Sequence, residues 1–236
     1  MGIPKGLSLA IIKIKPAEAM ILPLAETKEK TLNLTAYKKI KDFLKNIDVL
    51  LIGPGLTQNK STQGLIRKLI LNTDKTTVID ADGINALAGH LGRAKMKKIK
   101  TKSIVITPHP GEMAKLTGEG IKEVQANRLE VARKFAHKHK VTVVLKGHKT
   151  VVADYKDNLY INGTGNPGMA KAGSGDVLAG IIAAFLGQGL NVFEAAKYAV
   201  YLHGLAGDLA AKEKTQLGMI ASDIIEKIPA AIKLCS

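Results

Sequence analysis

The chain has 236 residues, of which 46% are hydrophobic and 23% charged, a balance typical of a globular protein with one sizeable core. No apolar run approaches the roughly 20 residues of a membrane-spanning helix, and the first residues lack the hydrophobic segment and cleavage site of a secretory signal. The only cysteine, Cys235, excludes a disulfide framework and a thiolate metal cage. We therefore expect a single domain over residues 1–236, located in the cytoplasm and not at a membrane.

The formal net charge of +15 raises the question of nucleic-acid binding, because a basic surface attracts polyanions. The distribution of the charge argues against it. Lysines are scattered along the whole chain, and the densest basic run, residues 93–102, contains no aromatic side chain on which a base could stack. We predict no nucleic-acid partner and a solvated lysine surface that attracts anionic substrates such as nucleotides.

Short aliphatic runs alternate with longer amphipathic segments along the middle of the chain, which is typical of an α/β protein. The runs expected to form buried parallel strands are 48–52, 76–80, 103–107 and 141–145. The segments expected to form helices lie near 60–72, 83–90 and 121–139. Residues 150–161 are typical of a hairpin at the sheet edge, which would make the sheet mixed, and the pattern is helical beyond 176.

A polar or glycine-rich motif follows each of the four expected strands. These motifs are Gly53-Pro54-Gly55, Asp80-Ala81-Asp82-Gly83, Pro108-His109-Pro110-Gly111-Glu112 and Lys146-Gly147-His148-Lys149-Thr150. Ligands of open parallel sheets bind just beyond the carboxyl ends of the strands. The sequence therefore predicts that the four loops converge on one binding site.

Residues 162–180 place six glycines around a single carboxylate, Asp176, and lead directly into an apolar helical stretch. Gly173, Ser174 and Gly175 lack bulk, so their N–H groups can turn toward one anion, and a helix that begins near Asp176 adds unpaired N–H groups. Those groups would keep Asp176 ionised, and it could then take a proton from a hydroxyl brought to the phosphate. The alternative is a glycine-rich turn in which Asp176 is an ordinary N-cap.

Other polar residues have structural interpretations. His203 lies among alanine, leucine and glycine on an expected helix, where a core histidine with a satisfied polar partner is more common than a metal ligand. Asp80, Asp82 and Asn85 are expected to cap the helix that follows them, with a substrate contact from Asp82 or Asn85 as the alternative.

Taken in order, these motifs resemble those of the ADP/ATP-dependent NAD(P)H-hydrate dehydratases, from about residue 15 to the C-terminus. Residues 108–112 and 166–180 distinguish this family from other ribokinase-like proteins. The resemblance implies a three-layer ribokinase-like α/β fold with a mostly parallel central sheet and helices on both faces. It also implies that hydrated NADH or NADPH is phosphorylated by ATP or ADP, with Mg²⁺ expected, and then loses phosphate to restore the reduced cofactor.

The resemblance assigns a role to each motif. Asp176 corresponds to the base, and Glu112 either orients a magnesium-bound water or caps a helix, so the metal ligands stay open. His109 is expected to be a neutral hydrogen-bonding partner. The nucleotide-binding residues would be Lys146, Gly147, His148, Lys149, Thr150, Asn166, Pro167, Gly168, Met169, Ala170, Lys171, Ala172, Gly173, Ser174 and Gly175. The substrate-binding residues would be Gly55, His109, Pro110, Gly111, Glu112, Met113, Ala114, Lys115 and Asp176.

The chain departs from the family pattern in several places. The usual N-terminal strand, Gly-Gly-Ser turn and alanine-rich helix do not precede Ile3, so we expect exposed apolar sheet and formation of a homo-oligomer. We also expect no fused epimerase domain and therefore no interconversion of the two hydrate epimers by this chain. Thr57 replaces a usual glycine, and its side chain is expected to intrude on the substrate. Lys171 replaces a usual threonine and would either attract phosphate or crowd the nucleotide. The alternative functions are a ribokinase-like kinase of a small metabolite and a nucleotide-binding remnant without turnover.

Overall fold

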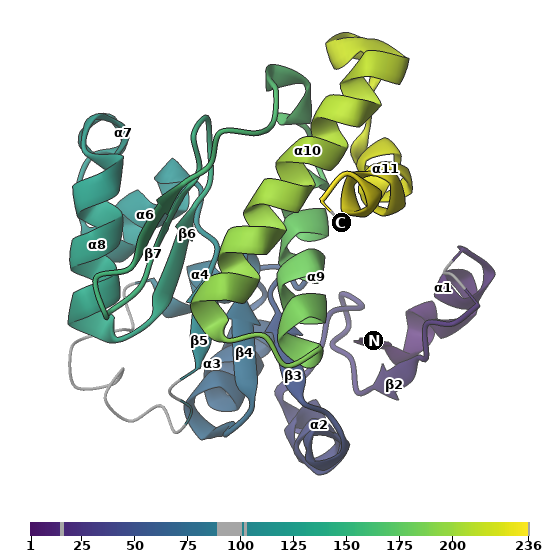
Figure 1. The fold of residues 1–236 in the computed structure, drawn as a ribbon. Helices are drawn as coiled ribbons and strands as arrows, with labels where there is room; N and C mark the ends of the chain where they lie inside the picture. Colours follow the sequence, from purple (N-terminus) through teal and green to yellow (C-terminus); the bar gives the residue numbers. More distant parts are fainter. Residues whose placement is uncertain (15–16, 89–100, 102, 236) are drawn as a thin grey trace.

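The computed structural model describes residues 1–14, 17–88, 101 and 103–235. A six-stranded sheet forms a middle layer between two layers of helices (Figure 1). Its strands, in spatial and chain order, are β3 (Val49–Ile52), β4 (Thr76–Ile79), β5 (Ile104–Ile106), β6 (Thr142–Leu145), β7 (Val151–Ala153) and β8 (Leu159–Ile161). Strands β3 to β6 pair in parallel, whereas β7 pairs antiparallel with β6 and β8. The predicted mixed, mostly parallel sheet and its edge hairpin are confirmed.

The continuous aliphatic runs form strands because both faces of the sheet are buried. Side chains alternate across a strand, so neighbouring residues enter different cores. Val78 lies in the core under one helical layer and Ile79 in the core under the other, and Val144 and Val143 divide in the same way. A strand buried on both faces needs no polar alternation, which explains the pattern of the sequence.

One helical layer covers the sheet face that carries Ile79. It consists of α2 (Tyr37–Phe43), α3 (Lys60–Asn72), α4 (Asp82–Leu87), α6 (Pro110–Thr117), α7 (Ile121–Ala126) and α8 (Arg128–His139). The helix predicted at 60–72 is confirmed. The predicted helix 121–139 is two helices, because Asn127 leaves helical geometry with φ −123° and ψ 34°. The helix predicted at 83–90 ends at Leu87, and residues 89 and 90 lie outside the described residues. Of the basic run 93–102, only Thr101 is described.

The opposite layer consists of α9 (Ser174–Gly187), α10 (Val192–Gly218) and α11 (Ala221–Lys233), of which α9 and α10 lie in front of the sheet in Figure 1. The small side chains of α10 allow close packing, and those with no exposed surface are Ala195, Ala196, Ala199, Ala206 and Ala210. Within the described ranges, no helix combines the length and the apolar character that a membrane crossing requires.

The N-terminal segment forms a small structure of its own beside the main sheet. Strands β1 (Gly2–Pro4) and β2 (Leu22–Leu24) pair in parallel, and α1 (Ser8–Ile14) lies between them in the chain, well away from the six-stranded sheet in Figure 1. No side chain of α1 is buried, and Leu9, Ile12 and Ile14 are 78%, 53% and 79% exposed.

Candidate active site

The loops that follow the parallel strands meet at one edge of the sheet, as predicted. The loop after β3 approaches the end of β4 so closely that a Cβ on Gly53, which has φ +135°, would lie 1.7 Å from the carbonyl oxygen of Asp80. The loops after β5 and β6 are joined by a 2.8 Å hydrogen bond from the Lys146 N–H to the Pro108 carbonyl. Only glycine fits the first of these contacts, which explains the Gly-Pro-Gly motif.

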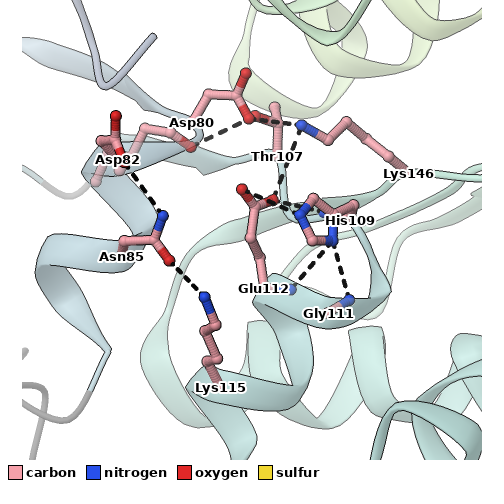
Figure 2. A network of polar contacts seen from close by, with 10 residues as sticks. Asp80, Asp82, Asn85, Thr107, His109, Gly111, Glu112, Lys115 and Lys146 are labelled. Carbon is pink, nitrogen blue, oxygen red and sulfur yellow. Dashed lines mark hydrogen bonds and ion pairs between the residues drawn. The ribbon is translucent and has the colours of Figure 1, made fainter. Parts of the chain in front are cut away.

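A buried ion pair lies at the centre of this edge (Figure 2). The Lys146 ammonium is 2.7 Å from Asp80 Oδ1 and 4.0 Å from Glu112 Oε2, and the three side chains are 18%, 1% and 7% exposed. Asp80 is therefore not the helix cap that the sequence predicts: the N-cap of α4 is Ala81, without a side-chain hydrogen bond. The prediction was wrong because a buried ammonium needs a counter-charge, and strand order places Asp80 near it.

Asp82 and Asn85 do not cap α4 either. Asp82 Oδ2 accepts a 2.8 Å hydrogen bond from the Thr57 N–H, and Asp82 Oδ1 accepts one of 3.4 Å from Asn85 Nδ2. The Asn85 oxygen in turn accepts a 3.1 Å hydrogen bond from the Lys115 ammonium (Figure 2). These side chains join the loop after β3 to α4 and α6, so they brace the rim of the site.

His109 and Glu112 form a reciprocal cap at the start of α6. His109 Nδ1 accepts hydrogen bonds of 3.0 and 3.2 Å from the N–H groups of Gly111 and Glu112, and Glu112 Oε2 accepts one of 2.8 Å from the His109 N–H. Of the two roles predicted for Glu112, helix capping is therefore confirmed. Because Nδ1 is an acceptor, a neutral His109 ring carries its proton on Nε2, and this nitrogen lies 3.5 Å from Glu112 Oε1.

The loop after β6 owes its shape to Arg128, the first residue of α8. Its guanidinium donates hydrogen bonds of 2.7 Å to the Leu145 carbonyl and 2.8 Å to the His148 carbonyl. Gly147, with φ +138°, passes so close that a Cβ there would lie 2.6 Å from Arg128 Nη1. The Thr150 hydroxyl donates to the Gly147 carbonyl at 2.9 Å. Sequence reasoning missed Arg128, because nothing in its local pattern marks a residue so far from the loop along the chain.

We expect Arg128→Ala to loosen this loop and weaken ATP binding about tenfold, since two charge-assisted hydrogen bonds to the loop carbonyls are lost. Isothermal titration with ATP measures the effect, and Arg128→Lys should recover part of it. Arg133→Ala is the matched control, because Arg133 lies on the same helix in an exposed ion pair with Glu130. Unchanged ATP affinity in Arg128→Ala would show that the loop keeps its shape without the guanidinium.

The glycine-rich segment ends at the N-terminus of α9. Gly173 is the N-cap, with φ +85° and no side-chain hydrogen bond to the first turn, and Ser174, Gly175 and Asp176 occupy that turn. The helix thus begins two residues earlier than predicted, and the alternative of Asp176 as N-cap is wrong. A Cβ on Gly175 would lie 3.2 Å from the Lys146 ammonium, so the ammonium lies against this first turn. Backbone N–H groups and a lysine together favour an anion here.

Asp176 lies in the first turn of α9, and its surroundings there favour the protonated carboxyl group more than bulk water does. Partial burial raises the pKa of Asp176 above its ordinary value, the charge of Asp80 raises it further, and the Lys146 ammonium offsets part of the rise. The sequence predicted that the N–H groups would keep the carboxylate ionised, whereas burial and Asp80 shift it the other way. A carboxylate with a raised pKa is a stronger base than an ordinary one.

Residues 166–172 are tied to α10. Asn166 Nδ2 donates to Asp208 Oδ1 at 2.9 Å, and the Gly165 N–H donates to Asp208 Oδ2 at 2.8 Å, a support that sequence reasoning missed. The Lys171 ammonium donates to the carbonyls of Leu217 and Met219, at 2.6 Å each. The charge of Lys171 is thus bound at the carbonyl end of α10, where a cation is favoured, and both roles predicted for it toward the nucleotide stay predictions.

Thr57 has φ +66°, a conformation that a β-branched residue adopts at a cost, whereas Gly55 at φ +67° has open space around it. We expect Thr57→Gly to raise the free energy of unfolding by about 1 kcal/mol. Glycine removes the backbone strain, and its larger loss of conformational entropy on folding offsets part of that gain. Urea unfolding measures the change. Asp157→Gly, at φ 64° in the β7–β8 turn, is the control and should gain less, because aspartate tolerates this conformation. Loss of stability in Thr57→Gly would contradict the assignment of strain.

His203 on α10 lies beneath the first turn of α9. It is 8% exposed, its Nε2 is 3.4 Å from the Ser174 hydroxyl, and burial lowers the pKa of His203 to about 4. The predicted core histidine with a polar partner is confirmed.

The fold places the protein in the ribokinase-like class of α/β folds. Ribokinase from Thermotoga maritima has the same fold, with a TM-score of 0.56 at 18% identity over 99% of this chain and 79% of its own. The model of one family, NAD(P)H-hydrate dehydratase, matches residues 9–230. The chain belongs to the NAD(P)H-hydrate dehydratase family.

Two further relatives bear on the function. The bifunctional NAD(P)H-hydrate repair enzyme Nnr of Moorella thermoacetica is 42% identical over 232 residues, which are 98% of this chain and 43% of that protein. The ADP/ATP-dependent NAD(P)H-hydrate dehydratase of Bacillus subtilis, co-crystallised with ATP and Mg²⁺, superposes with a TM-score of 0.79 at 29% identity over 99% of this chain and 77% of its own. The chain thus spans less than half the length of the Moorella relative.

Proposed function

We propose that the protein dehydrates hydrated NADH or NADPH at the expense of ATP or ADP and so restores the reduced cofactor. The observation that carries the proposal is the position of Asp176 in the first turn of α9, next to the Lys146 ammonium and with a raised pKa. A base, an anion-binding helix end and a fixed positive charge are thus together. Membership of the dehydratase family supports the choice of reaction.

In the proposed mechanism, Asp176 takes the proton of the nicotinamide-ring hydroxyl, and the hydroxyl oxygen attacks the terminal phosphoryl group of the nucleotide. The N–H groups of the first turn of α9 and the Lys146 ammonium stabilise the charge on the transferring group. The ring carbon–oxygen bond then breaks, phosphate leaves, and loss of a proton from the adjacent carbon restores the double bond. Phosphorylation is needed because hydroxide is a poor leaving group.

The Bacillus enzyme was co-crystallised with ATP and Mg²⁺, whereas the side chains that the structure describes here do not group into a magnesium site of their own. Within the described ranges there is no group of three or more His, Cys, Asp or Glu residues able to hold a metal ion. Asp80 is bound by Lys146, and Glu112 caps α6. We therefore propose that Mg²⁺ arrives with the nucleotide and is not held by protein side chains alone.

The experiment is to follow recovery of reduced-nicotinamide absorbance from hydrated NADH and hydrated NADPH, with ATP and ADP tried separately. Recovery is the expected result. A stable phosphorylated product without recovery would replace this proposal with a kinase, and nucleotide binding without turnover would replace it with a nucleotide-binding protein.

We also propose that the protein forms a homo-oligomer, on the ground that the apolar side chains of α1 are exposed. Sedimentation velocity should show a species larger than a monomer, and Ile12→Asp with Leu9→Asp should shift it toward the monomer. A monodisperse wild-type monomer would contradict this. The single domain over 1–236 and the cytoplasmic location stay predictions.

A further inference from the structure

We propose that the Lys146 ammonium is the resident cation of this site and fills the position between the carboxylates of Asp80 and Glu112 where a divalent metal would otherwise bind. The inference stands on the arrangement of these three side chains and is independent of the proposed dehydration.

The two carboxylates converge from different parts of the sheet edge. Asp80 follows β4, Glu112 lies in the first turn of α6, and both residues are buried. Two buried carboxylates that approach one point need a cation, because bringing both charges out of water is costly. Oxygen ligands of this kind are those that Mg²⁺ and Mn²⁺ prefer.

Lys146 supplies that cation from the next strand. It follows β6, and its ammonium lies 2.7 Å from Asp80 Oδ1 and 4.0 Å from Glu112 Oε2 (Figure 2). A metal ion bound to Asp80 Oδ1 would have to displace this ammonium. The covalent tether makes the ammonium hard to displace, because its effective concentration at the carboxylates is fixed by the strand.

The tether also fixes the direction of the charge. The ammonium lies against the first turn of α9, since a Cβ on Gly175 would be 3.2 Å from it. It therefore presents one positive charge toward the anion-binding helix end whether or not a metal ion is available. A metal in the same place would present two charges and would exchange with solvent.

The test is Mn²⁺ binding to nucleotide-free protein, measured by electron paramagnetic resonance of the free ion. Wild type should show no stoichiometric binding. Lys146→Ala should bind one Mn²⁺ at least about tenfold more tightly than wild type, because it opens the space between two carboxylates. The double variant with Asp80→Asn should lose that binding. Lys115→Ala is the matched control: it removes a neighbouring lysine that contacts Asn85, and should bind no Mn²⁺.

Two results would overturn the inference. The first is stoichiometric Mn²⁺ binding by wild type that Asp80→Asn abolishes, which would show that the metal and Lys146 coexist; this comparison holds even where Lys146→Ala does not fold. The second is a folded Lys146→Ala, judged by circular dichroism, that binds Mn²⁺ no better than wild type. Neither result depends on turnover, so failure here is separate from failure of the dehydration assay.

Discussion

Asp176→Asn is expected to lower turnover about a thousandfold while ATP affinity stays within about threefold of wild type. The amide keeps the shape of the carboxylate but cannot take a proton from the substrate hydroxyl. In the proposed mechanism the nucleotide is held chiefly by backbone N–H groups of the first turn of α9 and by Lys146, which this change leaves in place. Single-turnover recovery of reduced nicotinamide measures the chemical step, and titration with ATP measures binding.

Asp42→Asn is the matched control, because Asp42 lies on α2 in an exposed ion pair with Lys45 and should leave turnover unchanged. Near-normal turnover in Asp176→Asn would remove Asp176 from the role of base. Loss of ATP affinity together with turnover would instead indicate that the carboxylate shapes the anion site.

We expect the raised pKa of Asp176 to determine the pH dependence of the proposed proton transfer. The base acts only when it is deprotonated, so turnover should fall on acidification at a higher pH than an ordinary aspartate would give. The contribution of Asp176 to the free energy of unfolding depends on pH in the opposite direction to turnover. A folded-state pKa above the unfolded value favours folding at low pH, and this contribution is lost as the pH rises through the folded pKa. Asp176→Asn should therefore abolish the fall of turnover at acidic pH. It should also abolish the part of the pH dependence of the free energy of unfolding that Asp176 contributes.

The layers and the sheet could be predicted because their signals are local. A strand buried on both faces must be a short aliphatic run, and α3 keeps its predicted bounds, 60–72, because Asn59 caps its start through its side chain. The division of residues 121–139 into two helices was not predictable, because Asn127 is compatible with either arrangement until the packing of α7 against α6 is known. Helix ends are set by such packing more than by propensity.

The site was predictable as a set of loops but not as a set of contacts. Strand order brings Asp80 and Lys146 together, although 66 residues separate them in the chain, so the sequence offered only local roles such as helix capping. Lys171 illustrates the same limit, since its partners are carbonyls at the end of α10. Sequence identifies which residues carry charge, and the topology decides which charges meet.

Lys146→Met is expected to lower the free energy of unfolding by about 3 kcal/mol, because it leaves the buried carboxylates of Asp80 and Glu112 near one another without a counter-charge. Methionine keeps most of the apolar stem, so packing contributes little to the loss. Urea unfolding followed by circular dichroism measures the change. The lost charge should also weaken ATP binding, since the ammonium lies against the first turn of α9.

The double variant Lys146→Met with Asp80→Asn should recover much of the stability but none of the ATP affinity. The reason is that replacement of both members of a buried pair removes the uncompensated charge, whereas the cation proposed to face the nucleotide stays absent. Lys227→Met is the matched control, because its ion pair with Glu213 is at the surface and its loss should have little effect. Equal unfolding midpoints for wild type and Lys146→Met would show that the pair adds nothing to the fold. In that case the buried pair would serve only to hold the ammonium against α9. Lys146 would then contribute to ATP affinity without contributing to the free energy of unfolding.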